Sequence, residues 1–285
     1  MTARTNPIYN HADPLRVVTL FSGYDSQCMA LDRLKQEFPP FDYTLEAWCE
    51  IDKYAIHAHN AVYPQWADRN LGDISQVNWD EVRKNIKGCD LLTYSFPCTN
   101  LSICGKQEGF EKGSGTASSL LWYCEDAIKE LRPRFLLMEN VKPLVSKKFL
   151  PLFNQWQTLL EGYGYSNFWQ VLNAKNYNVP QNRDRVFMVS IHDRHADFHF
   201  PQPMELQRRL GDVWEQGQVD EVFYLNETQV ERIVTHCWRK QQEGCGFKTN
   251  FQTKRGISGA IKTKEGSREY DTYLIEEIED NEQPI

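Results

Sequence analysis

The chain has 285 residues, of which 41% are hydrophobic, and its formal net charge is −7. This length allows one large domain plus a smaller one, with a core that needs neither metals nor disulfides. The sequence has no apolar run of the roughly 18 residues that a membrane helix needs, and its N-terminal residues lack an apolar signal core. We therefore expect a cytoplasmic protein.

Eight cysteines are spread along the chain without a C-x-x-C pair or an accompanying histidine cluster. A zinc site is therefore not expected. In a cytoplasmic protein most cysteines are small buried hydrophobic residues, but one can serve as a nucleophile where its surroundings favour it.

Strand and helix patterns alternate along the first 200 residues. Short apolar runs predict strands at residues 16–21, 43–49, 90–95, 134–139, 167–172 and 185–191. Helical spacing of apolar residues predicts helices at residues 27–38, 54–63, 119–131 and 149–160. This alternation predicts βαβ units, an α/β fold and a mainly parallel sheet. In such sheets ligands bind at the carboxyl ends of the strands, so functional residues should follow strands directly.

After residue 200 the alternation stops. Residues 213–235 look helical in parts, and residues 244–266 read as loops with short strands. We therefore predict a first domain at residues 1–200 and a second region at residues 201–285.

Charge is unevenly distributed within that second region. Residues 232–268 contain nine Lys and Arg against two Asp and Glu, whereas residues 269–285 contain seven Asp and Glu and no Lys or Arg. A basic segment within an acidic protein suits a restricted contact with phosphate. The alternative is a solvated loop with scattered charge.

Three segments near the first strands are candidates for holding a cofactor. Gly23 lies in the turn after the first strand, where glycine lets the backbone approach a ligand, although an ordinary strand–helix turn would have the same sequence. Glu50 ends the second strand and can accept hydrogen bonds from both hydroxyls of a ribose; a surface acid is the alternative. Asp73 follows a glycine turn and could hold the amine of an adenine, with Ile74 packing against the ring.

Cys98 ends the segment S-F-P-C, which follows the strand predicted at residues 90–95. The thiol would then face the ligand cleft, and a thiolate in that place is a potent nucleophile. A buried structural cysteine is the alternative.

Glu139 and two arginines complete the candidate catalytic groups. Glu139 ends an apolar strand, where a partly desolvated carboxyl group can stay protonated and donate to a ring nitrogen; a helix-capping acid is the alternative. Arg183 and Arg185, two residues apart at the start of a strand, should point the same way, which suits a phosphate or a base carbonyl. A salt-bridged strand edge would give the same pattern.

The order of these segments resembles the cytosine-C5 DNA methyltransferases. F-S-G, E-I-D, G-D-I, S-F-P-C, E-N-V and Q-N-R-D-R fall in that family's order between about residues 16 and 200. The resemblance implies a Rossmann-like fold. It also implies an enzyme that uses S-adenosylmethionine as its methyl donor and needs no metal. The cofactor site that it implies consists of Phe21, Gly23, Glu50, Ile51, Asp73, Ile74, Pro97 and Leu120.

The resemblance also implies a reaction. Cys98 would attack C6 of a cytosine while Glu139 binds N3 and the 4-amino group, and C5 would then take the methyl group. Arg185 would hold O2 of the base, and Arg183 would support the loop. Because C5 is out of reach inside a duplex, the cytosine must be flipped out of double-stranded DNA.

Several residues are candidates for contacting DNA. Thr99–Lys112 resembles the family's mobile catalytic loop, in which Ser102 would contact phosphate. Residues 201–285 should begin the target recognition region. Its candidate backbone contacts, which would make affinity fall with salt, are Lys248, Lys254, Arg255, Lys262 and Lys264.

The sequence departs from the family pattern in three places. Asp25 stands where the first motif usually has its second glycine, so Ser26 or main-chain amides would have to compensate. Thr99 follows the Pro-Cys pair, where glutamine is common. No Gly-Asn motif follows Phe200, although family members use such a motif to complete the cofactor site. We therefore expect a truncated chain, or a second polypeptide that supplies this motif. We also expect weak or absent activity of this chain alone. Otherwise we expect a monomer.

We predict a DNA cytosine-C5 methyltransferase for restriction–modification or phage DNA protection. One alternative is a tRNA cytosine-C5 methyltransferase, whose motifs are nearly the same. The other is a non-catalytic or split-subunit relative that binds DNA.

Overall fold

The computed structural model describes residues 9–101, 108–215, 217, 219–244, 250–261 and 271–275. They form two compact units. The first consists of Met1–Val171 and Arg185–Phe200, and the second of Leu172–Asp184 and Pro201–Ile285.

The segment Leu172–Asp184 belongs to the second unit, although we predicted it within the first domain. The difference has a local cause. Gln181 forms an isolated β-bridge with Ser258, and the Arg183 side chain donates to the carbonyl of Ile261. These pairings lie far apart in sequence, so periodicity cannot reveal them.

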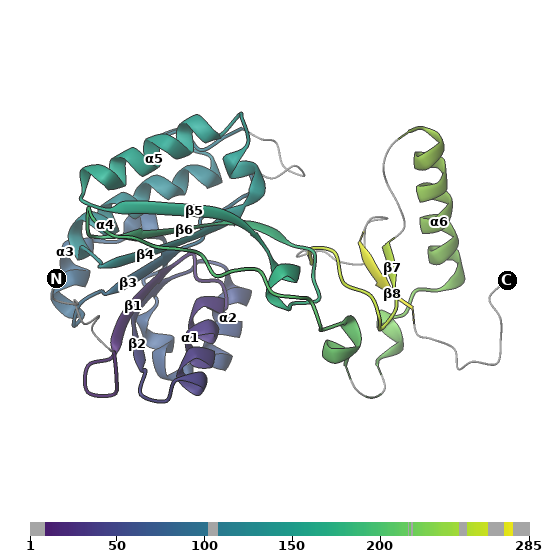
Figure 1. Cartoon of the computed structure of the whole chain (residues 1–285), viewed down its shortest axis with the longest axis horizontal. Coiled ribbons are helices and arrows are strands. Elements are labelled where there is room, and N and C mark those ends of the chain that lie inside the picture. Colours follow the sequence, from purple (N-terminus) through teal and green to yellow (C-terminus); the bar gives the residue numbers. More distant parts are fainter. Residues whose placement is uncertain are drawn as a thin grey trace. The chain divides into compact units, whose positions relative to one another are not determined.

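The first unit is built on a six-stranded sheet (Figure 1). Its strands are β1 Leu15–Leu20, β2 Tyr43–Cys49, β3 Leu91–Tyr94, β4 Phe135–Val141, β5 Ser166–Asn173 and β6 Asp184–Ile191. Their order is β2-β1-β3-β4-β6-β5. β2, β1, β3 and β4 run parallel, and β6 is antiparallel to β4. The predicted mainly parallel α/β sheet is therefore confirmed.

Helices cover both faces of this sheet. The α-helices of the first unit are α1 Ser26–Glu37, α2 Lys53–Val62, α3 Trp79–Asn85, α4 Cys124–Leu131 and α5 Leu150–Gly162. α1 and α2 lie on one face, and α3, α4 and α5 lie on the other (Figure 1). Short 3-10 helices connect the elements of both units: η1 Pro64–Arg69, η2 Ile74–Gln76, η3 Ala117–Tyr123, η4 Lys142–Val145, η5 Ala174–Tyr177, η6 Leu210–Val213 and η7 Glu221–Phe223.

Neighbouring residues of β1 belong to different parts of the core. Val17 packs in a cluster with Cys28 of α1 and Leu45 of β2, whereas Val18 packs with Ile128 of α4 and Trp156 of α5. Burial on both faces is typical of parallel strands and explains why β1 reads as a continuous apolar run.

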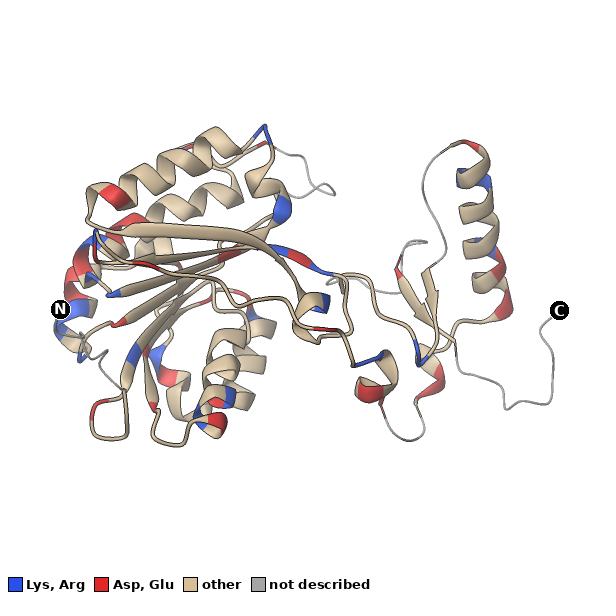
Figure 2. Cartoon of the chain, viewed as in Figure 1, with Lys and Arg blue, Asp and Glu red and all other residues tan. Residues whose placement is uncertain are grey.

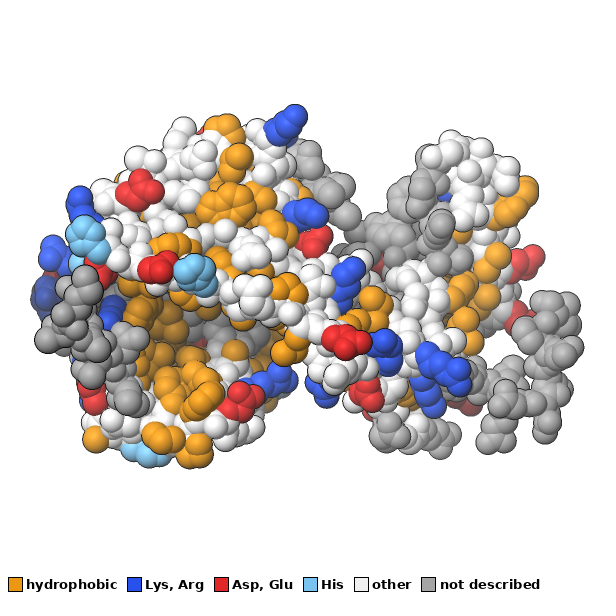
Figure 3. All heavy atoms as spheres, viewed as in Figure 1, with side chains coloured by type: hydrophobic (Ala, Val, Ile, Leu, Met, Phe, Trp, Pro, Cys, Tyr) orange, Lys and Arg blue, Asp and Glu red, His pale blue; other side chains and the backbone are white. Residues whose placement is uncertain are grey.

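Side chains on the two faces of β4 and β6 are not equally buried. Leu136 and Met138 of β4 are buried, but Leu137 is only half-buried, as is its partner Val189 of β6. Figure 3 shows hydrophobic side chains gathered in a hollow of the first unit, between α1 and the level of β5 and β6.

Two helical segments differ from their predictions. The helix predicted at residues 119–131 begins as the 3-10 helix η3, capped by Thr116, and becomes α-helical only at Cys124. The short helix α3 was not predicted. Asn78 caps it, and Trp79 and Val82 are its only buried residues, so it has too few turns to show a period.

The described part of the second unit contains α6 Glu227–Gln242 and the parallel pair β7 Asn250–Gln252 and β8 Thr272–Leu274. A reciprocal capping box of Asn226 and Gln229 starts α6. Across the described residues of both units, the helices are too short or too polar to cross a membrane.

Candidate active site

Cys98 follows β3 in a segment whose backbone is held from two sides. The buried side chain of Asn140 donates from Nδ2 to the carbonyl of Phe96 at 3.0 Å. The buried Ser118 donates from Oγ to the carbonyl of Pro97 at 2.6 Å. Cys98 itself is half-buried. Its main chain is therefore fixed by β4 and η3 while its side chain stays accessible.

Glu139 and Arg185 form an ion pair in the first unit, with Arg185 Nε 2.8 Å from Glu139 Oε1. Their side chains are 27% and 19% exposed. The antiparallel register, which sets Arg185 opposite Val141, brings the two side chains together diagonally. Because the hydrogen bond is charge-assisted, it fixes the orientation of both groups.

The strand that carries Glu139 is longer than predicted. We predicted its end at Glu139, whereas β4 continues to Val141. The cause is β6, because this antiparallel partner pairs with β4 as far as Val141 and brings Arg185 to Glu139.

Cys98 and Glu139 leave the same edge of the sheet. Tyr94 at the end of β3 pairs with Met138, the residue before Glu139, on the parallel strand β4. The hydrogen bond from Asn140 to Phe96 then ties the segment that carries Cys98 to the end of β4. Cys98, on the loop after β3, and Glu139, near the end of β4, therefore both lie towards the carboxyl edge of the sheet, where ligands bind in such folds.

Arg183 has a different partner from Arg185. It belongs to the second unit, where its Nη1 donates to the carbonyl of Ile261 at 3.2 Å. The spacing of two residues predicted one common direction for the two arginines. The pairing of β6 with β4 sets the direction of the Arg185 side chain. Arg183 precedes β6, so this pairing does not set the direction of its side chain.

Glu50 is held by three backbone amides at the end of β2. Gly23 donates to its Oε2 at 2.9 Å, and Ile51 and Asp52 both donate to its Oε1 at 2.8 Å. Phe21 and Gly23 have left-handed backbones, with φ of 56° and 58°. A Cβ atom added at Gly23 would meet no described atom within 4 Å, so open space adjoins this turn.

Asn70 also supports Glu50, a role that the sequence did not reveal. Its Oδ1 accepts from the amide of Glu50 at 3.2 Å, and its Nδ2 donates to the carbonyl of Glu50 at 3.1 Å. The same Oδ1 accepts from the amide of Gly72 at 2.9 Å. Asn70 thereby connects Glu50 to the turn before Asp73.

The other predicted cofactor residues differ in exposure. Asp73 caps η2 and accepts from the amide and hydroxyl of Ser75. Ile74 is only 5% exposed and packs in the core, whereas Ile51 is 68% exposed and offers the larger apolar surface. Pro97 and Leu120 are half-buried.

Four of the predicted DNA contacts, Ser102, Lys248, Lys262 and Lys264, lie outside the described residues. Lys254 and Arg255 are exposed in the turn after β7. The Lys254 ammonium group lies 5.6 Å from the centroid of the Trp214 ring, which orients it by a cation–π contact.

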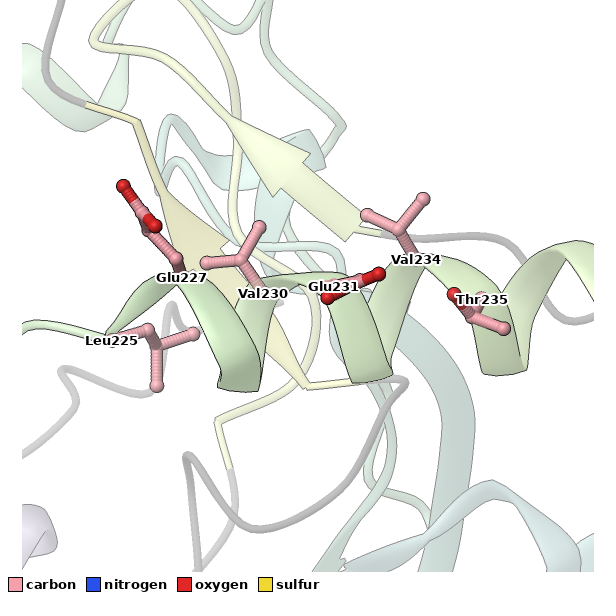
Figure 4. A pocket seen from close by; sticks show the side chains of 6 residues that line it. All are labelled: Leu225, Glu227, Val230, Glu231, Val234 and Thr235. Carbon is pink, nitrogen blue, oxygen red and sulfur yellow. The ribbon is translucent and has the colours of Figure 1, made fainter.

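Helix α6 does not present a uniformly basic surface. Glu227 and Glu231 share the helix with Arg232, Arg239 and Lys240, so both signs of charge occur along it (Figure 2). The two glutamates also line a groove along α6 (Figure 4), together with Leu225, Val230, Val234 and Thr235. Carboxylates repel phosphate, so this groove does not suit a DNA backbone.

Glu125 anchors the end of the segment predicted as the catalytic loop. Its carboxylate contacts Lys112 at 2.7 Å, Lys129 at 2.6 Å and the hydroxyl of Tyr163 at 2.7 Å. Burial raises the pKa of Glu125, but these hydrogen bonds outweigh burial and lower the pKa to about 2.

We therefore expect Glu125→Gln to lower the free energy of unfolding by about 2 kcal/mol at pH 7. A depressed pKa stabilises the fold above the unfolded-state value near 4.5 and loses this effect as pH falls towards 2. Urea unfolding should show a difference between the two proteins that narrows below about pH 4.5. Glu130→Gln, which removes a more exposed ion pair with Arg83, is the control. A difference independent of pH would contradict this account.

Two relatives show the extent of the similarity to known proteins. The type II methyltransferase M2.ScrFI of Lactococcus lactis subsp. cremoris is 44% identical over 163 residues, covering 57% of this chain and 44% of that relative. The orphan methyltransferase M.SssI of Spiroplasma monobiae is 45% identical over 228 residues, covering 73% of this chain and 58% of that relative. The chain thus spans about half the length of these curated relatives.

Solved structures share the fold. The S. pombe Dnmt2 methyltransferase matches with a TM-score of 0.61 and 17% identity, over 85% of this chain and 68% of that one. The Entamoeba histolytica methyltransferase EhMeth matches with a TM-score of 0.63 and 15% identity, with the same coverage. The Rossmann-like sheet predicted from the resemblance is therefore confirmed.

The family model of the C-5 cytosine-specific DNA methylases matches residues 15–283, nearly the whole chain. This match covers every segment from which the resemblance was first drawn. The chain therefore belongs to the C-5 cytosine-specific DNA methylase family.

Proposed function

We propose that the protein transfers a methyl group from S-adenosylmethionine to C5 of a flipped cytosine in double-stranded DNA. The observation that carries this proposal is the placement of Cys98 and the Glu139–Arg185 pair at one edge of adjacent strands. Relatives named type II and orphan methyltransferases, several of them from phages, support a role in restriction–modification or phage DNA protection.

The residues at the ends of β1 and β2 fit S-adenosylmethionine. Glu50 has its carboxylate fixed by three amides and retains acceptor capacity for ribose hydroxyls. Ile51 offers an apolar surface to the adenine ring, and Asp73 an acceptor for its amine. Open space beside Gly23 leaves room for the methionine part. When bound, the cofactor supplies its methyl group from a sulfonium centre.

Cys98 starts the reaction in this proposal. Its thiolate attacks C6 of the cytosine, forming a C–S bond and moving the π electrons of the C5–C6 bond towards C4 and N3. The carboxyl group of Glu139 gives a proton to N3 and accepts from the 4-amino group, and Arg185 donates to O2, so both stabilise the charge that the attack creates. C5 then takes the methyl group as the bond from that group to the sulfonium sulfur breaks, and S-adenosylhomocysteine leaves. Transfer of the C5 proton to solvent re-forms the C5–C6 double bond, expels the Cys98 thiolate and restores aromaticity. No step requires a metal.

We also propose roles for the remaining candidate residues. Phe21, Pro97 and Leu120 would complete the cofactor site, to which Ile74 offers only the small part of its side chain that is exposed. Arg183 would support the loop that leads to Arg185. Lys254 and Arg255 would contact the DNA backbone. We still predict, without a test so far, that a second polypeptide completes the cofactor site.

A tritium-release assay tests the choice of substrate. We expect cytosine C5 tritium to be released from duplex DNA at least about 100-fold faster than from tRNA, because the wrong nucleic acid leaves polar contacts unmade. Faster release from tRNA would replace the DNA assignment by the RNA alternative. The non-catalytic alternative would give release from neither, with DNA binding retained, even when the predicted second polypeptide is supplied.

A further inference from the structure

Asp25 is a fully buried carboxyl group beside the turn that carries Gly23. None of its surface is exposed, and its backbone is left-handed, with φ 65°. It caps α1 by accepting from the amide of Cys28 at 3.4 Å. Aspartate tolerates the left-handed region better than most residues. Asp25 therefore adopts a backbone conformation that otherwise favours glycine, and it adds a carboxyl group to the interior.

Thr19 of β1 holds this carboxyl group. The buried Thr19 Oγ1 donates to Asp25 Oδ2 at 2.9 Å. Burial raises the pKa of Asp25, and the hydrogen bond from Thr19 is the strongest effect that opposes the rise. Removing the threonine hydroxyl would leave the carboxylate less well compensated.

His59 of α2 faces the same carboxyl group. It is also fully buried, and its Nε2 lies 3.7 Å from Asp25 Oδ2. Its ring stacks on Trp48 of β2, with ring centroids 3.7 Å apart. Within the described residues, no hydrogen-bond partner reaches this Nε2. The carboxyl group therefore joins β1, α1 and α2 at one buried point.

A short chain of hydrogen bonds leads from Asp25 to Glu50. The amide of Asp25 donates to the carbonyl of Ser22 at 2.8 Å, and the Ser22 hydroxyl contacts Thr19 Oγ1 at 2.8 Å. The next residue, Gly23, donates to Glu50 Oε2 at 2.9 Å. A displacement of Asp25 would therefore shift the turn that contacts Glu50.

We propose that Asp25 is a positioning residue for the cofactor site, and that its buried carboxyl group fixes the turn so that Gly23 keeps its contact with Glu50. The inference rests on the proposed function, because it assumes that this turn and Glu50 hold S-adenosylmethionine. Asp25 acts through the loop and does not touch the cofactor. It thereby makes up for the absence of the family's glycine.

Titration calorimetry of the whole chain with S-adenosylhomocysteine tests this inference without measuring methyl transfer. We expect Asp25→Ala to weaken binding about tenfold and Thr19→Val about fivefold, because each removes the shared hydrogen bond. The double variant should bind about as Asp25→Ala does, since the two effects pass through one contact. Asp25→Asn, which keeps the cap and the acceptor, should restore affinity to within about threefold.

Two further variants serve as controls for effects on folding. Asn78→Ala removes the cap of α3, away from this turn, so it should lower thermal stability and leave affinity unchanged. Asp25→Gly removes the carboxyl group without backbone strain, and it should also weaken binding about tenfold if Asp25→Ala fails to fold.

The outcomes separate this inference from the proposed function. Wild-type affinity in folded Asp25→Ala or Asp25→Gly, or additive effects in the double variant, would overturn the positioning role alone. Absence of binding by the unsubstituted chain, or wild-type binding by Glu50→Ala, would overturn the proposed cofactor site and the inference with it.

Discussion

Cys98→Ser is expected to abolish methyl transfer to DNA, with a loss of at least about 10⁴-fold in rate. A serine hydroxyl is almost entirely protonated at neutral pH and is a poor nucleophile towards C6, whereas a thiol provides a reactive thiolate. The substitution is nearly isosteric, and the carbonyls of Phe96 and Pro97 keep their hydrogen bonds, so the segment should keep its conformation. Incorporation of labelled methyl groups into DNA measures the effect.

Cys89→Ser is the matched control for this substitution. Cys89 is another free, partly buried cysteine, and its Sγ donates weakly to the carbonyl of Leu91. Burial raises the pKa of the Cys89 thiol above its ordinary value, so it is not a competing nucleophile. We expect the control to retain most of the activity. Residual methylation above about 0.01% of the unsubstituted rate in Cys98→Ser would contradict a covalent role for Cys98.

Glu139→Gln is expected to lower the turnover rate by about 10²–10³-fold while DNA affinity stays nearly unchanged. Glutamine keeps the shape of the side chain but loses the charge that Arg185 contacts and the proton exchange with N3 of the base. The loss should therefore appear in kcat and not in the dissociation constant for DNA. Pre-steady-state methylation rates and a DNA titration separate the two quantities.

Glu161→Gln, on the exposed side of α5, provides a matched change of charge away from the site. It should change neither kcat nor the dissociation constant for DNA. If Glu139→Gln turned over at the wild-type rate, the carboxyl group would have no role in activating the base. If it lost DNA affinity instead, Glu139 would be a binding residue only.

The parallel half of the fold could be predicted from local pattern. β1 reads as an apolar run, β2 has buried apolar residues at alternate positions from Tyr43 to Ala47, and the helices after them carry apolar residues at helical spacing. The antiparallel insertion of β6 could not be predicted, because its pairing with β4 depends on the chain between them and not on local pattern. The extension of β4 past Glu139 is a consequence of that pairing.

The reactive groups could be identified from the sequence, whereas the side chains that hold the backbone around them could not. Cys98 and Glu139 stand in short motifs after apolar runs, which gives a local signal. Asn70 and Ser118 act on backbone atoms of residues 20 or more positions away, and no motif marks them. Asn140 stands in the E-N-V motif, but its contact with Phe96, 44 positions away, has no local signal. Asp25 was recognised as a departure, but the direction of its side chain depends on Thr19, which belongs to a strand interior.

The most direct test of the central claim is covalent trapping on duplex DNA that carries 5-fluorocytosine, in the presence of S-adenosylmethionine. Fluorine at C5 cannot leave as a proton does, so the thioether between enzyme and base should persist. We predict a stable protein–DNA complex whose cross-linked peptide, sequenced by mass spectrometry, carries the base on Cys98. A complex joined through any other residue, or no complex from protein that binds both the DNA and the cofactor, would contradict the account.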